Sequence, residues 1–282
     1  MENGSGMMLL TGSGRVCRTG PPGCGPVAPT IVGSVRCTRR AGSDCLSKHI
    51  GIVAVSPEGS ALCYREIFRH AARLVGGKGH PIVTLHNQPL SEYVDAVMGD
   101  DWERVGEMLA RSARVLATAG AEFCIVPDNL MQFGIHLAET RSPIPFLKMT
   151  DLVAERVCQD RRSVVGLIGT KLVMRGSTYQ THLGIRGVRV ETPDDADAEI
   201  VNQIIFRELV YGVVRPESQK QVLEVAGRLA ARGCEGIILG CSEAPLLISP
   251  ENLSVAVYDA TDLLAEEAVR CSLGERSLPS RG

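Results

Sequence analysis

The sequence predicts an α/β protein with two pseudo-symmetric domains, each a mostly parallel sheet flanked by helices, and an active site in the cleft between them. Three observations support this prediction. From residue 49 onward, short runs rich in Val and Ile alternate with longer amphipathic stretches, which is the pattern of βαβ units. Several of the short runs are apolar throughout, as strands buried on both faces are. In addition, the chain repeats itself once.

The expected strands are short and mainly aliphatic, and each is followed by a stretch with helical periodicity. In one of these stretches, Val105, Met108 and Leu109 begin an apolar stripe that faces one side of a helix. The expected strands are residues 49–56, 81–86, 122–128, 144–148, 163–170, 188–192, 236–240 and 254–258. The expected helices are residues 60–75, 90–119, 130–139, 151–159, 195–211, 217–232 and 261–271.

The repeat joins a helix, a glycine turn and a strand at one constant spacing. Residues 120–129 align with residues 233–242 at an offset of 113, and Leu116 in the helix before them aligns with Leu229. A shared offset across three kinds of structure indicates an internal duplication. The alternative is two unrelated βαβ units that look alike because all such units do.

The expected domain division follows this repeat. Residues 49–147 together with 250–272 form the first α/β domain, and residues 148–249 form the second. Residues 273–282 are expected to be a flexible tail. Residues 1–48 contain nine glycines and four cysteines without helical or strand periodicity, which predicts a disordered extension or a translated region upstream of the true start.

Composition excludes several classes of function. The formal net charge is −2 and aromatic residues make up 4% of the chain, so a nucleic-acid partner is not expected. No run of about 18 apolar residues is present, so no membrane partner is expected either. The cysteine spacings do not match a zinc site, and thiols scattered in apolar runs are typical of a reduced, cytoplasmic protein.

The repeat places two reactive side chains at equivalent strand ends. Asp128 ends one strand and Cys241 ends its counterpart, and parallel sheets bind ligands beyond the carboxyl ends of their strands. Two proton-transferring groups on opposite faces of a carbon are what inversion at that carbon needs. Taken singly, a residue such as Cys241 is more often a small buried residue, and one such as Asp128 is more often the N-cap of the helix that follows.

These residues carry a family resemblance. The segment 240–243 (Gly-Cys-Ser-Glu), its lead-in at residues 233–239 and the segment 56–60 (Ser-Pro-Glu-Gly-Ser) resemble the aspartate/glutamate/hydantoin racemase superfamily, nearest its aspartate racemase branch. The resemblance covers roughly residues 49–271. It implies an isomerase, an aspartate/glutamate-like amino-acid racemase that transfers protons without pyridoxal phosphate, any other cofactor or a metal. It also implies a homodimer.

The chain departs from the family pattern at its first motif. Asp128 stands where the family has its first cysteine, while Leu130 and Gln132 replace a threonine and a histidine. Residues 86–90 also lack the basic residue with which aspartate racemases meet a side-chain carboxylate. This argues against a substrate with an acidic side chain.

The proposed chemistry assigns further roles. Cys241 is expected to act as a thiolate base, aided by a helix that begins after it, and Asp128 as an acid whose pKa burial raises. Glu243 would orient a group or bind the substrate ammonium, unless it is only a first-turn helix acid. Four residues at strand ends could bind the substrate carboxylate, or only cap turns. They are Asn129, Ser242, Ser56 and Thr170.

Two alternatives remain open at the level of sequence. The first is a decarboxylase, a cis–trans isomerase or a lyase of the same superfamily, in which Cys241 works alone and Asp128 is structural. The second is a non-catalytic protein that binds a small molecule on the same scaffold. In each case the expected partner is a small amino acid or carboxylate.

Overall fold

The computed structural model describes residues 47–76 and 79–279. The expected N-terminal extension lies outside the described residues except for its last two positions. Of these, Lys48 is joined to Ser272 by a backbone hydrogen bond of 2.8 Å.

The first lobe contains a parallel four-stranded sheet in the order β2-β1-β3-β4. Its strands are β1 (Ile50–Ala54), β2 (Val83–Asn87), β3 (Phe123–Ile125) and β4 (Phe146–Leu147). Its helices are α1 (Pro57–Val75), α2 (Leu90–Met98), α3 (Trp102–Thr118), the 3₁₀ turn η1 (Met131–Gly134) and α4 (Ile135–Glu139).

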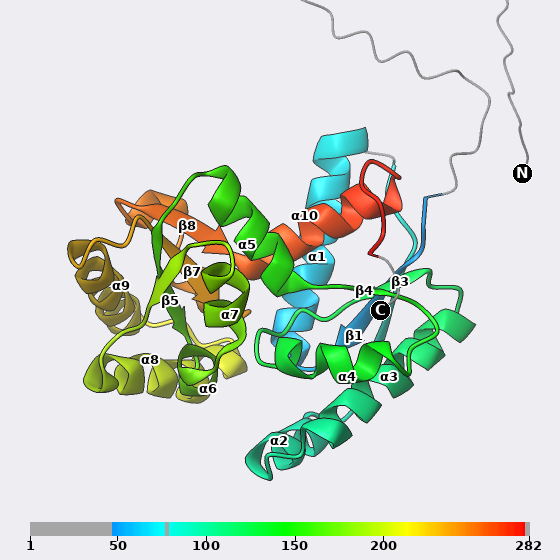
Figure 1. The fold of residues 1–282 in the computed structure, drawn as a ribbon, viewed down its shortest axis with the longest axis horizontal. Coiled ribbons are helices and arrows are strands. Elements are labelled where there is room, and N and C mark those ends of the chain that lie inside the picture. Colours follow the sequence, from blue (N-terminus) through cyan, green and yellow to red (C-terminus); the bar gives the residue numbers. More distant parts are fainter. Residues whose placement is uncertain (1–46, 77–78, 280–282) are drawn as a thin grey trace, which may run out of the picture. The chain divides into compact units, whose positions relative to one another are not determined.

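The second lobe repeats this arrangement in the order β6-β5-β7-β8, again with parallel pairs (Figure 1). Its strands are β5 (Val164–Gly169), β6 (Arg189–Glu191), β7 (Gly236–Gly240) and β8 (Ala256–Asp259). The remaining helices are α5 (Met149–Gln159), α6 (Lys171–Arg175), α7 (Thr178–Gly184), α8 (Asp195–Arg207), α9 (Pro216–Ala231) and α10 (Ala260–Ser272), with 3₁₀ turns η2 (Leu209–Tyr211), η3 (Ala244–Leu246) and η4 (Pro250–Asn252).

The equal strand orders confirm the predicted fold class of two like α/β halves. The repeat is also visible in the backbone, because Gly120 and Gly233 hold the same unusual conformation, with φ of 97° and 93°. Each glycine follows a helix and precedes the strand that ends at a candidate residue. A left-handed φ of this size favours glycine, so the matching glycines mark equivalent turns.

Several elements differ from the expectation. No helix was expected over residues 171–184, where the structure has α6 and α7. The helix expected over residues 90–119 is two helices, α2 and α3, separated at Asp100, whose φ is 53°. Asp101 then caps α3 by accepting a hydrogen bond of 3.0 Å from the Arg104 amide. Helical periodicity on both sides of the break hid it, since a single left-handed residue leaves the apolar pattern almost intact.

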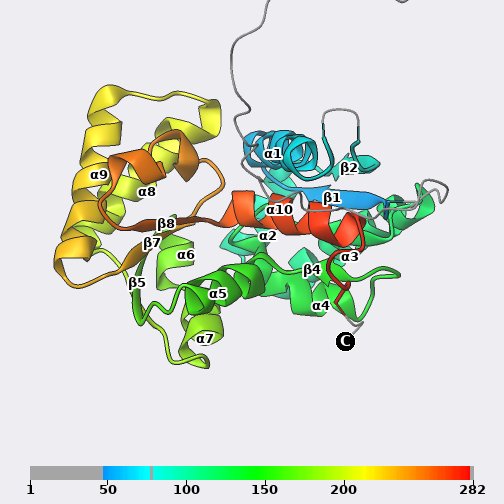
Figure 2. The ribbon, with the colours of Figure 1, turned by 90° about the horizontal axis from the view of Figure 1, so that it is seen from above.

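The last strand and helix divide between the lobes. We assigned residues 250–272 to the first domain, whereas β8 pairs with β7 of the second sheet. Only α10 crosses to the first lobe, where it packs against α1 and also against α5. Figure 2 shows α5 and α10 lying between the two lobes. The strand joins the second sheet because its backbone groups complete the free edge of β7.

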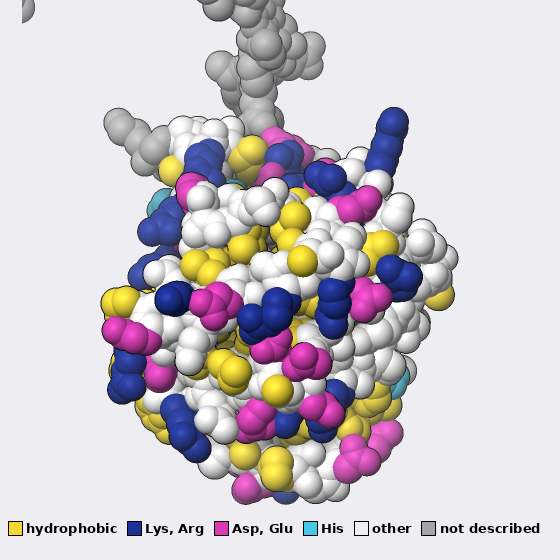
Figure 3. Space-filling model, turned by 90° about the vertical axis from the view of Figure 1, so that its left-hand side faces the viewer, with side chains coloured by type: hydrophobic (Ala, Val, Ile, Leu, Met, Phe, Trp, Pro, Cys, Tyr) yellow, Lys and Arg dark blue, Asp and Glu magenta, His cyan; other side chains and the backbone are white. Residues whose placement is uncertain are grey.

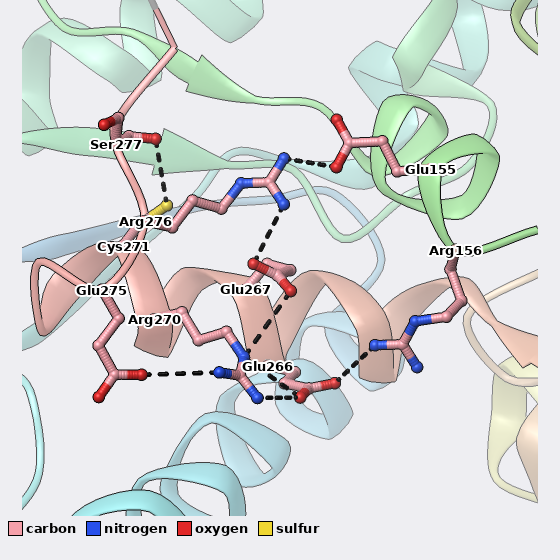
Figure 4. A network of polar contacts seen from close by, with 9 residues as sticks. All are labelled: Glu155, Arg156, Glu266, Glu267, Arg270, Cys271, Glu275, Arg276 and Ser277. Carbon is pink, nitrogen blue, oxygen red and sulfur yellow. Dashed lines mark hydrogen bonds and ion pairs between the residues drawn. The ribbon is translucent and has the colours of Figure 1, made fainter. Parts of the chain in front are cut away.

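The described part of the expected tail is held by ion pairs. Arg276 lies 2.7 Å from Glu155 of α5 and 3.3 Å from Glu267 of α10 (Figure 4). The same network continues along α10, where Arg270 contacts Glu266 at 2.9 Å. The chain after α10 therefore packs back onto the two helices between the lobes.

One apolar cluster runs through both lobes. It includes residues of β1 and β3 from the first sheet, residues of β5 and β7 from the second, and the buried faces of α1, α5 and α10. Representative members, all fully buried, are Ile52, Ile125, Leu167, Ile238 and Leu264. The sheets thus share buried surface, which fixes the carboxyl ends of their strands relative to one another.

Within the described residues, none of the helices is both long and apolar enough to cross a membrane. Figure 3 shows positive and negative side chains interspersed over one face of the protein.

Candidate functional site

The candidate residues lie at the carboxyl ends of parallel strands. Ser56 follows β1, Asp128 follows β3, Thr170 follows β5 and Cys241 follows β7. The central strands of both sheets therefore end in polar or reactive side chains. This is the sheet edge at which open α/β folds place their ligands.

Glu243 is the centre of a hydrogen-bonded cluster. Its Oε2 accepts from the Cys241 thiol at 3.0 Å and from the Ser242 hydroxyl at 2.9 Å. Its Oε1 accepts from the Ser56 hydroxyl at 3.0 Å. Glu243 is 3% exposed and Cys241 is 7% exposed. The cluster thus joins the carboxyl ends of β1 and β7, one from each lobe.

The thiol of Cys241 is held in its neutral form. Burial raises the pKa of Cys241 well above its ordinary value, and the neighbouring Glu243 carboxylate raises it further. The expectation that a helix after Cys241 would favour the thiolate is wrong. The next element is η3, a three-residue 3₁₀ turn, and the Glu243 side chain turns back onto the sulfur instead.

Asp128 caps the turn that follows it, and its pKa is raised. Its Oδ1 accepts hydrogen bonds from the amides of Leu130 at 3.0 Å and Met131 at 3.1 Å, which is the capping role the sequence left open. Burial raises the pKa of Asp128 to about 6, and the Glu243 charge adds to that rise. The Asp128 charge in turn raises the pKa of Cys241, so the two groups lie within electrostatic reach.

Asn129 presents an unpaired donor. Its Oδ1 accepts a hydrogen bond of 2.6 Å from the Tyr179 hydroxyl. Its Nδ2 is buried and finds no partner among the described residues. A buried amide donor without a partner costs free energy, unless a ligand atom accepts from it. Asn129 is 4% exposed, and it lines a cavity of about 240 Å³.

Thr170 and Gln132 have structural roles. Thr170 caps α6 by accepting a hydrogen bond of 3.3 Å from the Val173 amide. Gln132 donates to the Val126 carbonyl at 2.9 Å and accepts from the Met149 amide at 3.0 Å. The carboxamide of Gln132 therefore fixes the loop that carries Asp128 against the start of α5.

Sequence reasoning missed two supports of the site. Tyr179 orients Asn129 from 50 positions away in the chain, and no local pattern marks that pairing. Gly59 lets α1 approach the cluster, because a Cβ there would lie 2.2 Å from the Ser242 hydroxyl oxygen. The segment 56–60 contained this glycine, but its closest contact comes from Ser242 of the other lobe, which no local pattern marks.

A group of possible metal ligands lies elsewhere. The ligand atoms of Glu66, His70 and Asp262 lie within 4.8 Å of one another at the contact of α1 with α10. The His70 Nε2 is 2.7 Å from Asp262 Oδ1, and Glu66 is paired with Arg69. None of the candidate residues belongs to this group.

The fold and this pair of strand ends define a class of protein. It is a two-lobed α/β protein with titratable groups at equivalent positions of duplicated parallel sheets. The model of the Asp/Glu/Hydantoin racemase family matches residues 52–268. The chain therefore belongs to the Asp/Glu/hydantoin racemase family.

Three relatives illustrate this membership. A candidate Asp/Glu racemase from Yersinia pestis is 32% identical, with a TM-score of 0.74 over 80% of this chain and 99% of that one. PH1733, an aspartate racemase homologue from Pyrococcus horikoshii OT3, is 26% identical, with a TM-score of 0.71 over the same shares. An uncharacterized protein from the pnlA 3′ region of Pectobacterium carotovorum subsp. carotovorum is 30% identical over 131 residues, which are 44% of this chain and 82% of that protein.

Proposed function

We propose that this chain is a racemase or epimerase of an α-amino acid that works without a cofactor, by proton transfer between Asp128 and Cys241. The observation that carries the proposal is the placement of two titratable groups after equivalent strands of the two lobes, within electrostatic reach of each other. Proton donors and acceptors on opposite faces of a carbon are the minimum that inversion requires.

The resting protonation states set the direction of the first step. With a pKa of about 6, Asp128 is mainly a carboxylate at neutral pH, whereas Cys241 keeps its proton. Asp128 therefore removes the α-proton from one face, and the thiol of Cys241 delivers its proton to the other. This reverses the roles expected from the sequence. The opposite enantiomer reacts from the state in which Asp128 is protonated and Cys241 is a thiolate.

Glu243 orients the acid. It accepts a hydrogen bond from the Cys241 thiol and so holds in place the sulfur whose proton passes to the substrate carbon and returns from it. Ser56 and Ser242 donate to the same carboxylate and hold it in place. Asn129 supplies a free N–H for the substrate carboxylate, a contact that strengthens as negative charge builds up beside it.

A second candidate function rests on the capping bonds of Asp128. Its Oδ1 already accepts hydrogen bonds from the amides of Leu130 and Met131. If that is its whole role, Cys241 acts alone, as in a decarboxylase, a cis–trans isomerase or a lyase. Asp128→Asn distinguishes the two functions, because asparagine retains the capping oxygen but cannot act as a base. The variant should lose activity in the two-residue mechanism and keep it if Asp128 only caps the turn.

Proton exchange in deuterium oxide tests the proposal. The full chain is incubated with both enantiomers of a panel of amino acids, and α-deuteration is followed by NMR. We expect deuterium in both product enantiomers, with a loss of about 100-fold or more in Asp128→Asn and in Cys241→Ala. Exchange that survives in Asp128→Asn contradicts the two-residue mechanism. The absence of exchange with every amino acid contradicts racemisation.

A further inference from the structure

The cavity beside Asn129 has apolar walls contributed by both lobes. It measures about 240 Å³. Its lining residues are Trp102, Asn129, Leu130, Phe133, Leu172, Val173, Gly176, Ser177 and Thr178. None of them carries a charge. Trp102 and Phe133 pack edge to face with ring centroids 4.6 Å apart and form an aromatic wall.

Two lining residues leave apolar surface open to the cavity. Phe133 is 38% exposed and Leu172 is 49% exposed. Phe133 belongs to η1, close after Asp128, whereas Leu172 belongs to α6 of the other lobe. Apolar surface on both sides of a cavity gains free energy when an apolar group displaces the water between them.

The nearby cations are already engaged. On α6, Lys171 is paired with Glu199, and Arg175 lies 2.6 Å from Asp195. Both partners belong to α8. The groups at the adjacent strand ends, Asp128 and Glu243, are acidic. A second carboxylate on the substrate would therefore meet like charges and no free cation among the cavity residues.

Asn129 joins this cavity to the strand ends. Tyr179 holds its Oδ1, which leaves the two N–H bonds of Nδ2 for an acceptor. A carboxylate oxygen of the ligand satisfies that donor. A ligand anchored there has its α-carbon near the end of β3 and its side chain in the cavity.

We propose that this cavity is the side-chain pocket of the substrate and that it selects α-amino acids with a bulky apolar side chain, such as leucine or phenylalanine, over aspartate and glutamate. This inference rests on the proposed function. The uncharged lining, the exposed apolar surface of Phe133 and Leu172 and the paired cations of α6 support it together.

The test is a side-chain series on the full chain. Exchange and calorimetric binding are measured in parallel for alanine, 2-aminobutyrate, norvaline, leucine and phenylalanine, and for aspartate and glutamate. We expect kcat/KM to rise by at least about tenfold for each methylene up to norvaline, since a hydrophobic pocket discriminates to that extent. Leucine and phenylalanine should exceed both acidic amino acids.

A positive charge introduced into the cavity lining tests the pocket directly. Leu172→Arg adds a cation on a side chain that is already half exposed, so the fold tolerates it. It should lower kcat/KM and affinity for leucine at least about tenfold and raise them for glutamate. Ile185→Arg is the control, because Ile185 is 77% exposed in the same lobe and outside the cavity. It should leave the preference unchanged.

The outcomes separate the two proposals. Exchange that is fastest with aspartate or glutamate overturns the apolar pocket and leaves the racemase standing. If no amino acid exchanges, the racemase proposal falls, and the binding series still decides the pocket. The inference is contradicted if the acidic amino acids bind more tightly than the apolar ones. It is also contradicted if Leu172→Arg leaves the affinities for leucine and glutamate unchanged.

Discussion

Two buried residues with raised pKa values carry the proposed chemistry. Asp128 has a pKa raised to about 6 and Cys241 has a pKa raised well above its ordinary value, in both cases first by burial. At neutral pH Asp128 is therefore mainly a carboxylate and Cys241 a thiol, as the proposed mechanism requires. Neither residue alone would indicate this, since a buried thiol and a capping aspartate are both common.

The pH dependence follows from these protonation states. In the proposed mechanism the Asp128 carboxylate removes the α-proton, so kcat/KM should rise as pH increases through about 6. The activity should fall again only in strongly alkaline solution, where Cys241 loses its proton. A pH profile of exchange measures both limbs. A flat profile between pH 5 and 7 would mean that Asp128 does not act as the base.

The role of Glu243 can be measured on the sulfur itself. Glu243→Gln removes the charge that raises the pKa of Cys241, so the thiol should ionise at lower pH. Alkylation rates followed against pH report that ionisation, with Cys241→Ala giving the background from the other thiols. Exchange should fall at the same time, since the Cys241 thiol loses the carboxylate that orients it. An unchanged or higher pKa in Glu243→Gln would contradict this assignment.

The sequence points to the two proposed reacting residues more clearly than to their partners. Asp128 and Cys241 stand out because each ends an apolar run in a repeated segment. Glu243 was predicted as a site residue. Its contact with the Cys241 sulfur depends on a tight turn that the sequence does not predict. The pairing of Asn129 with Tyr179 links two lobes and has no local signal.

At the level of elements, periodicity located the strands and most helices. It failed where one residue changes the chain direction, as at Asp100, and where a strand has to be assigned to a sheet, as with β8. Strand pairing is a tertiary choice, since any free edge offers the same backbone groups. The carboxyl ends of the strands were nevertheless placed correctly, because those depend only on the order of elements along the chain.

The start of α1 provides an element-scale prediction. In Gly59→Ala the new Cβ would lie 2.2 Å from the Ser242 hydroxyl oxygen and 2.8 Å from that of Ser56. The helix must shift from the cluster, so we expect loss of exchange activity and a decrease of about 1–3 kcal/mol in the free energy of unfolding. Chemical denaturation and the exchange assay measure the two effects.

Gly227 provides the matched control. It lies inside α9, and a Cβ there meets nothing within 4 Å. Gly227→Ala should therefore stabilise the protein by up to about 1 kcal/mol through helix propensity and leave exchange unchanged. Equal effects of the two substitutions would show that the contact between Gly59 and Ser242 is not what matters.

At the level of the whole molecule, the shared apolar cluster makes one folding unit of two lobes. The single tryptophan, Trp102, lies in the first lobe, whereas Leu167 is buried in the second. We expect tryptophan fluorescence and far-UV circular dichroism to report the same denaturation midpoint. Leu167→Ala should lower the free energy of unfolding by about 2–5 kcal/mol, and both signals should report the same decrease. If Leu167→Ala left the midpoint of the tryptophan transition unchanged, the two lobes would unfold separately.

The matched strand orders of the two sheets have a consequence for chemistry. In an assembly of two identical small chains, a molecule bound on the symmetry axis would meet the same side chain from both directions. A single polypeptide containing both halves is free of that constraint. One half can end its strand in an oxygen acid and the other in a sulfur acid, so left- and right-handed forms of a ligand need not be treated alike.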